Sequence, residues 1–86
     1  FEAAGYRTSY GSPLYASHVS NYDAGVIHLL RAQGAAILGK THTTAFAYYD
    51  PAPTRNPHRP SHTPGGSSSG SAAAVAAGMV PFAIGS

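Results

Sequence analysis

The sequence predicts an α/β fold, because a helical pattern followed directly by a short apolar run occurs twice along the chain. The first pair spans residues 24–40 and the second spans residues 69–85. The chain has 86 residues and no cysteine, so it can form at most one small domain without disulfide support. We therefore expect helices that pack on a sheet.

The apolar residues are too small to build a large core. Sixteen of them are alanine, and one methyl group removes little area from water. Ordering a chain costs roughly 1.5 kcal/mol per residue, which a core of this kind does not offset. We therefore expect residues 1–86 to form part of a domain, with their apolar elements packed on further polypeptide.

The first segment of the chain is irregular. Residues 1–21 are rich in Tyr, Ser and Gly and show no sustained period, which predicts loops around at most one short strand. A helix is predicted over residues 24–33, with Asp23 as its N-cap and Gly34 just past its end. Its apolar stripe consists of Val26, Ile27, Leu29 and Leu30.

The second half of the chain repeats this order around a loop. Residues 35–40 are predicted to be a short strand, and the proline-rich residues 50–66 an extended loop in which Arg55 holds backbone carbonyls. The alanine-rich residues 69–77 predict a second helix, because alanine has the highest helix propensity. Residues 80–85 then predict a second buried strand.

Charge and composition argue against several function classes. The net charge of +2 comes from dispersed bases without a basic run, so nucleic acid is an unlikely partner. No apolar stretch reaches the roughly 20 residues of a membrane span. The absence of cysteine and of a visible signal peptide favours the cytoplasm. His58 and His62 have a metal-like spacing, but the neighbouring prolines prevent a regular helix, so no metal site is expected.

The Gly/Ser segment, residues 64–71, is where we expect function, and its pattern allows three interpretations. Gly65 and Gly70 have the spacing of a phosphate loop, but Ser71 stands where that motif needs lysine. The same segment fits the G-x-S-x-G pattern of serine hydrolases with Ser68 as nucleophile, although the preceding residues 59–64 do not suit the required strand. The third is a non-catalytic binding or interaction module in which the helix N-terminus holds an anion.

Four blocks of the sequence resemble consecutive blocks of the amidase signature family. They are GAAILGKT at 34–41, PTRNP at 53–57, TPGGSSSGSAAAVAAG at 63–78 and VPFA at 80–83. The resemblance implies a large mixed sheet flanked by helices. It also implies hydrolysis or transfer of a carboxamide through a Ser–cis-Ser–Lys triad, with a small-molecule amide as substrate and no metal or cofactor.

The resemblance assigns the bridging serine of that triad to Ser67, on a cis peptide bond expected at Gly66–Ser67 or Ser67–Ser68. A hydroxyl placed between a base and a nucleophile can relay a proton between them. The resemblance also implies that the substrate is contacted by Phe46, Ala47, Tyr48 and Ser68. It further implies a loop whose conformation depends on Gly65, Gly66 and Gly70. Residues 43–47 match the family's Thr-Thr-x-Phe-Ala block, in which Ala45 departs from the usual acidic residue.

The resemblance places the other two triad members outside residues 1–86. The catalytic lysine belongs to a block before Phe1, the nucleophilic serine belongs to a block after Ser86, and Lys40 aligns with neither. The expected partners are therefore the remainder of the polypeptide and possible further copies in a homo-oligomer. By itself this segment is expected to be inactive and not to fold cooperatively.

Overall fold

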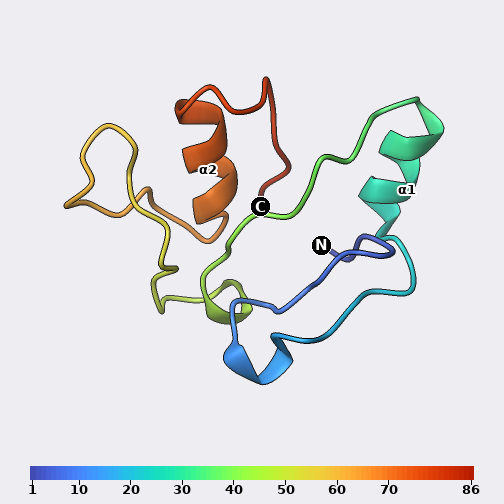
Figure 1. Cartoon of the computed structure of the whole chain (residues 1–86), viewed down its shortest axis with the longest axis horizontal. Coiled ribbons are helices and arrows are strands. Elements are labelled where there is room, and N and C mark those ends of the chain that lie inside the picture. Colours follow the sequence, from blue (N-terminus) through green and yellow to red (C-terminus); the bar gives the residue numbers. More distant parts are fainter. The chain divides into compact units, whose positions relative to one another are not determined.

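The structure is a computed structural model that describes residues 1–86. Its contacts divide the chain into two units, each described here by itself. Unit 1 comprises residues 1–9 and 13–40, and unit 2 comprises residues 10–12 and 41–86. Unit 1 contains the short 3-10 helix η1 (Pro13–Tyr15) and the helix α1 (Gly25–Ala32), whereas unit 2 contains η2 (Ala45–Ala47) and α2 (Ser69–Ala76), as Figure 1 shows.

The backbone of unit 1 is joined by a single antiparallel bridge between Arg7 and Val19. The amide of Thr8 donates to the carbonyl of His18 at 2.9 Å, and the amide of Ser20 donates to the carbonyl of Tyr6 at 3.0 Å. We expected at most one short strand in residues 1–21, and the structure has this bridge there and no longer strand.

The helix predicted over residues 24–33 is confirmed as α1, but its predicted cap is wrong. The N-cap position belongs to Ala24, and no side chain caps the helix. The carboxylate of Asp23 instead accepts the amide of Ala4 at 2.7 Å and pairs with Arg31 at 3.0 Å. The amide of Ala4 and the guanidinium of Arg31 therefore compete successfully with the local capping bond.

Both helices end as the sequence predicts, at a glycine in the left-handed region. Gly34 has a φ of 86° and Gly78 a φ of 74°. In each case the amide after the glycine donates to the carbonyl five residues earlier, at 3.0 Å and 2.9 Å respectively. This arrangement satisfies carbonyls that the last helical turn leaves without partners, and a glycine adopts it without a Cβ clash.

The strands predicted over residues 35–40 and 80–85 are wrong for this chain, since neither segment pairs with another. A strand needs a neighbouring backbone for its hydrogen bonds, and no segment supplies one here. The large mixed sheet of the predicted α/β fold therefore stays a prediction.

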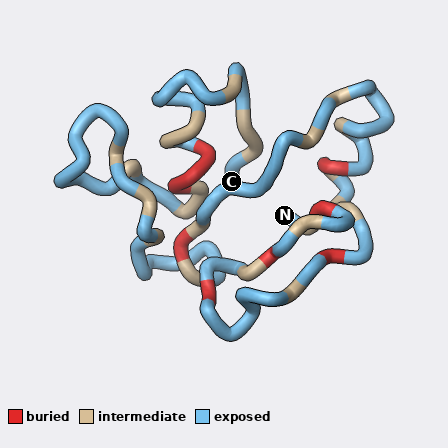
Figure 2. The backbone as a smooth tube through the Cα atoms, in the orientation of Figure 1, coloured by how far each residue is buried: buried red, intermediate tan, exposed pale blue.

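Few residues are buried, as Figure 2 shows. Most of the buried residues are polar. Ala3 and Ile27 are the only buried apolar residues, both in unit 1. Large side chains such as Leu14 and Leu38 are 86% and 76% exposed. The thin core expected from the alanine content is confirmed. Neither helix has the length and apolar character needed to cross a membrane.

Candidate functional site

The Gly/Ser segment leads into α2 and lies against residues 41–44 of unit 2. The amide of Gly70 donates to the carbonyl of His42 at 2.8 Å, and the amide of Thr44 donates to the carbonyl of Ser67 at 2.9 Å. Ser69 is 1% exposed, although its segment contains no large apolar side chain. Main-chain bonds and small side chains therefore hold the segment in place.

Two glycines of the segment allow this close approach. A Cβ on Gly70 would lie 2.5 Å from the amide nitrogen of His42 and 2.8 Å from the Cβ of Thr41. A Cβ on Gly66 would lie 3.0 Å from the Cγ2 of Thr44. Since ordinary contacts between carbon atoms are about 3.5–4.0 Å, position 70 in particular has no room for a side chain.

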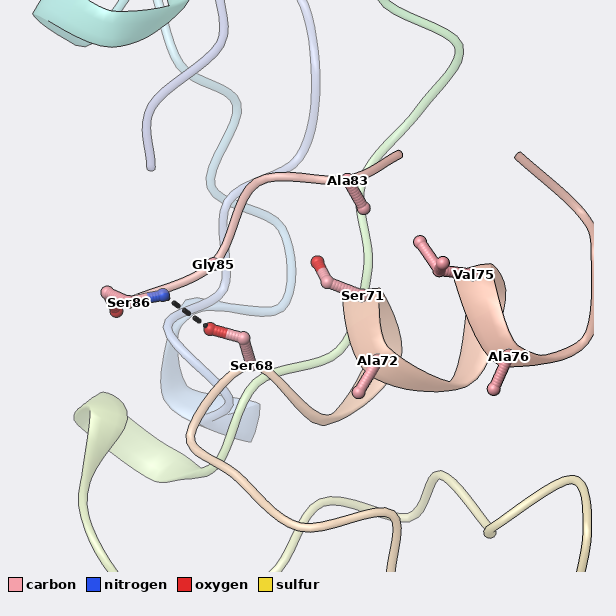
Figure 3. A pocket seen from close by; sticks show the side chains of 8 residues that line it. All are labelled: Ser68, Ser71, Ala72, Val75, Ala76, Ala83, Gly85 and Ser86. Carbon is pink, nitrogen blue, oxygen red and sulfur yellow. Dashed lines mark hydrogen bonds between the residues drawn. The ribbon is translucent and has the colours of Figure 1, made fainter. Parts of the chain in front are cut away.

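The segment carries four serines, and three of their hydroxyls bond to backbone groups. Figure 3 shows one of these bonds, in which Ser68 faces Ser86. The three bonds are Ser69 to the Gly65 carbonyl at 2.6 Å, Ser71 to the Ile84 carbonyl at 2.7 Å, and the Ser86 amide to Ser68 at 3.0 Å. Ser71 also shares a hydrogen bond of 2.8 Å with Thr41. These three hydroxyls therefore have structural roles within the chain.

Ser67 differs from the other three serines. Its side-chain hydroxyl has no hydrogen-bond partner within the chain, and the residue is half-buried. The peptide bond between Gly66 and Ser67 is cis, at one of the two bonds where the resemblance implied it. The carbonyl of Ser67 is fixed by Thr44, so the hydroxyl is positioned by its own backbone while remaining available to another group.

Thr44 is a residue of this site that the sequence analysis did not identify. It is 6% exposed, and its hydroxyl is buried without a hydrogen-bond partner. Threonines in loops are common, and no spacing in the sequence marks this one. Only the folded chain shows that its amide holds Ser67.

The residues expected near the substrate follow Thr44 in and just after η2. Phe46 and Ala47 have φ values of 50° and 57°, in the left-handed region, and the Phe46 ring stacks on Tyr10 with centroids 6.4 Å apart. Tyr48 is 72% exposed, and its ring packs on the ring of Tyr49 with centroids 4.5 Å apart. The bond between Thr44 and Ser67 links the start of η2 to the Gly/Ser segment, but no hydrogen bond joins residues 46–48 to the four serines.

An open groove of about 440 Å³ lies beside the segment, between α2 and residues 83–86 (Figure 3). Ser68 and Ser71 line the end of the groove near the start of α2. Val75 and Ala76 line it one turn further along the helix, where Val75 is 41% exposed. The groove thus combines two hydroxyls with a small apolar wall.

The other interpretations of the Gly/Ser segment gain no support from this geometry. Residues 59–64 form turns and loop and not the strand that must precede a nucleophile at Ser68. An anion at the start of α2 would have to bind without the amide of Gly70, which already donates to the carbonyl of His42.

Lys40 belongs to unit 1 and has partners of its own there. Its ammonium group donates to the hydroxyl of Thr8 at 2.8 Å and to the carbonyl of Arg7 at 3.4 Å. Burial of the ammonium lowers the pKa of Lys40, and the charge of Glu2 partly opposes this effect. The chain has no group of three side chains that could hold a metal ion.

Comparisons with known proteins identify the family. The family model described as Amidase matches residues 1–86. The A subunit of glutamyl-tRNA(Gln) amidotransferase from Salinibacter ruber is 50% identical, with 95% of this chain and 17% of that protein covered. The protein of the same name from Chromohalobacter salexigens is 47% identical, with 100% of this chain and 19% of that protein covered. The chain thus spans less than a fifth of the length of these curated relatives, and it belongs to the amidase family, as its signature blocks imply.

Proposed function

We propose that this chain is a segment of an enzyme that cleaves the C–N bond of a carboxamide, and that Ser67 is its proton-relaying serine. The observation that carries the proposal is the Ser67 hydroxyl, which alone among the four serines of the segment has no hydrogen-bond partner in the chain. A relay hydroxyl has to keep its donor and acceptor free for the groups between which the proton moves.

The proposed chemistry needs two groups from polypeptide beyond residues 1–86. A neutral lysine amine accepts the proton of the Ser67 hydroxyl, while Ser67 accepts the proton of a nucleophilic serine. That serine attacks the carbonyl carbon of the amide and forms an acyl-enzyme. The proton returns by the same route to the leaving nitrogen, which departs as ammonia or an amine. Water then takes the acyl group and returns a proton to the nucleophilic serine, and in nitrogen transfer the departing ammonia goes on to the acceptor.

The choice between hydrolysis and transfer is part of the same proposal. The relatives' names describe one chain of an amidotransferase, which supports transfer of nitrogen between substrates and a partner polypeptide for this protein too. We propose a small carboxamide as the nitrogen source in either case. Ammonia released without an acceptor indicates hydrolysis, whereas release that depends on an acceptor indicates transfer.

The experiment compares Ser67→Ala with Ser71→Ala in the intact protein. Loss of a positioned proton carrier typically costs about 10²–10⁴-fold in rate, so we expect kcat of Ser67→Ala to fall by that factor. Its stability should change by less than about 0.5 kcal/mol, because its hydroxyl makes no bond in the fold.

Ser71→Ala is the matched control, since it deletes the same atom four residues away. It should lose about 1–3 kcal/mol of stability, because the Ile84 carbonyl and the Thr41 hydroxyl both lose a partner. The proposal is wrong if Ser67→Ala keeps more than about a tenth of the wild-type kcat, given the size of a typical relay effect.

A further inference from the structure

We propose that the loop formed by residues 51–63 contains a binding site for a phosphate group, either free or as an ester. This loop lies in unit 2 and is drawn in yellow to orange in Figure 1. The site is separate from the proposed chemistry at Ser67. A hollow in the loop, the donors that line it, the charge around it and the hydrogen bonds within the loop all support this site.

The hollow has a volume of about 240 Å³ and is lined from both limbs of the loop. Thr54 and Arg55 come from the first limb, while Ser61, His62 and Thr63 come from the second. The lining therefore offers a guanidinium and an imidazole, one from each limb, beside three hydroxyls that already bond to His42, His62 and the Gly65 amide. Donors that come from two sides can reach different oxygens of a tetrahedral phosphate, and arginine is a common partner of phosphate.

The donors of the two basic residues are mostly unused. The Arg55 guanidinium makes one long hydrogen bond, of 3.4 Å to the Pro60 carbonyl, which agrees with its predicted role in holding backbone carbonyls. This bond uses one of five N–H groups. His62 bonds through Nδ1 to the neighbouring Ser61 hydroxyl at 3.1 Å, which leaves Nε2 without a partner.

The surrounding charge favours an anion. Residues 51–86 contain two arginines and two histidines, and no aspartate or glutamate. Asp50 immediately precedes this stretch but does not line the hollow. No carboxylate in the lining therefore competes with a ligand for Arg55 or His62.

The loop is braced internally, so its two limbs are held together before any ligand arrives. The amide of Asn56 donates to the carbonyl of His62 at 3.0 Å, and the amide of His62 donates to the carbonyl of Arg59 at 2.8 Å. The side-chain oxygen of Asn56 accepts the amides of His58 and Arg59 at 2.9 Å and 3.2 Å. A loop already closed by such bonds loses less conformational entropy on binding.

The test measures binding of inorganic phosphate and of glycerol 3-phosphate to the intact protein by calorimetry, without amide substrate. We expect Arg55→Gln to weaken phosphate binding at least about tenfold, as charge-assisted hydrogen bonds are lost. The control is Arg59→Gln, which makes the same charge change in the same loop outside the lining and should alter affinity less than about twofold. His62→Gln with control His58→Gln repeats the comparison without touching the Pro60 contact.

Each outcome decides the proposal. Binding of both probes supports an ester or free phosphate, and binding of inorganic phosphate alone supports the free ion. The site is refuted if neither probe binds at about 10 mM, a concentration that detects even the weakest specific affinities. It is also refuted if Arg59→Gln weakens binding as much as Arg55→Gln, because the effect would then come from net charge. Since amide cleavage is not assayed, failure here leaves the role of Ser67 unaffected.

Discussion

Replacing Gly70 with alanine tests whether the Gly/Ser segment is positioned by close backbone contact. The new Cβ would meet the amide nitrogen of His42 at 2.5 Å and its carbonyl oxygen at 3.0 Å. Neither atom can rotate away, and the amide of Gly70 itself is bonded to that carbonyl. Relief therefore requires α2 and residues 41–42 to separate.

The expected magnitude is the difference between two effects. Overpacking of a tight contact costs about 1–3 kcal/mol, and a clash with fixed backbone belongs near the upper end. Alanine regains up to about 1 kcal/mol of helix propensity over glycine. We therefore expect Gly70→Ala to lower the free energy of unfolding by about 2 kcal/mol.

Gly25→Ala in α1 is the matched control. Gly25 also lies in the first turn of an eight-residue helix, and a Cβ there would meet nothing within 4 Å. It should leave stability unchanged or raise it by up to about 1 kcal/mol. Denaturant unfolding of the intact protein measures both variants. If Gly70→Ala is as stable as Gly25→Ala, the close packing of α2 on residues 41–42 is incorrect.

Two further substitutions examine buried polar groups. Thr44→Val removes a hydroxyl that has no partner and keeps the shape of the side chain, so we expect about 1 kcal/mol of added stability. Thr8→Val removes a hydroxyl that bonds to Ser20 and Lys40, and it should cost about 1–3 kcal/mol of stability. Thermal unfolding compares the two, and an equal loss from both would show that Thr44 has a partner in the intact protein. Folding lowers the pKa of Lys40 below its ordinary value of 10.5. Near and just below pH 10.5 the unfolded chain therefore binds more protons than the folded chain, and the free energy of unfolding rises with pH. Lys40→Gln should lack this rise, and an unchanged pH profile in that variant would contradict the burial of the ammonium.

The sequence predicted those parts of the structure that depend on local interactions. Gly34 and Gly78 mark the ends of both helices because a left-handed residue is required within a few positions of the last turn. The proline-rich loop was equally predictable, since proline removes a backbone donor wherever it stands.

The parts that the sequence did not predict depend on partners far along the chain. Asp23 has the residue type of an N-cap, but its carboxylate bonds to the amide of Ala4, 19 residues away, and also pairs with Arg31 of α1 itself. The two expected strands lack partners within these residues, and strand formation is not a local property. The anchoring of Ser67 by Thr44 spans 23 residues, and no pattern in either segment indicates that pairing.

The bonds that tie residues 41–44 to the Gly/Ser segment run largely between main-chain atoms, with Thr44 donating to Ser67 and Gly70 donating to His42. Such bonds are the same whichever side chains those positions carry. The side chains of residues 42 and 45–48 can therefore change while the backbone of Ser67 keeps its position.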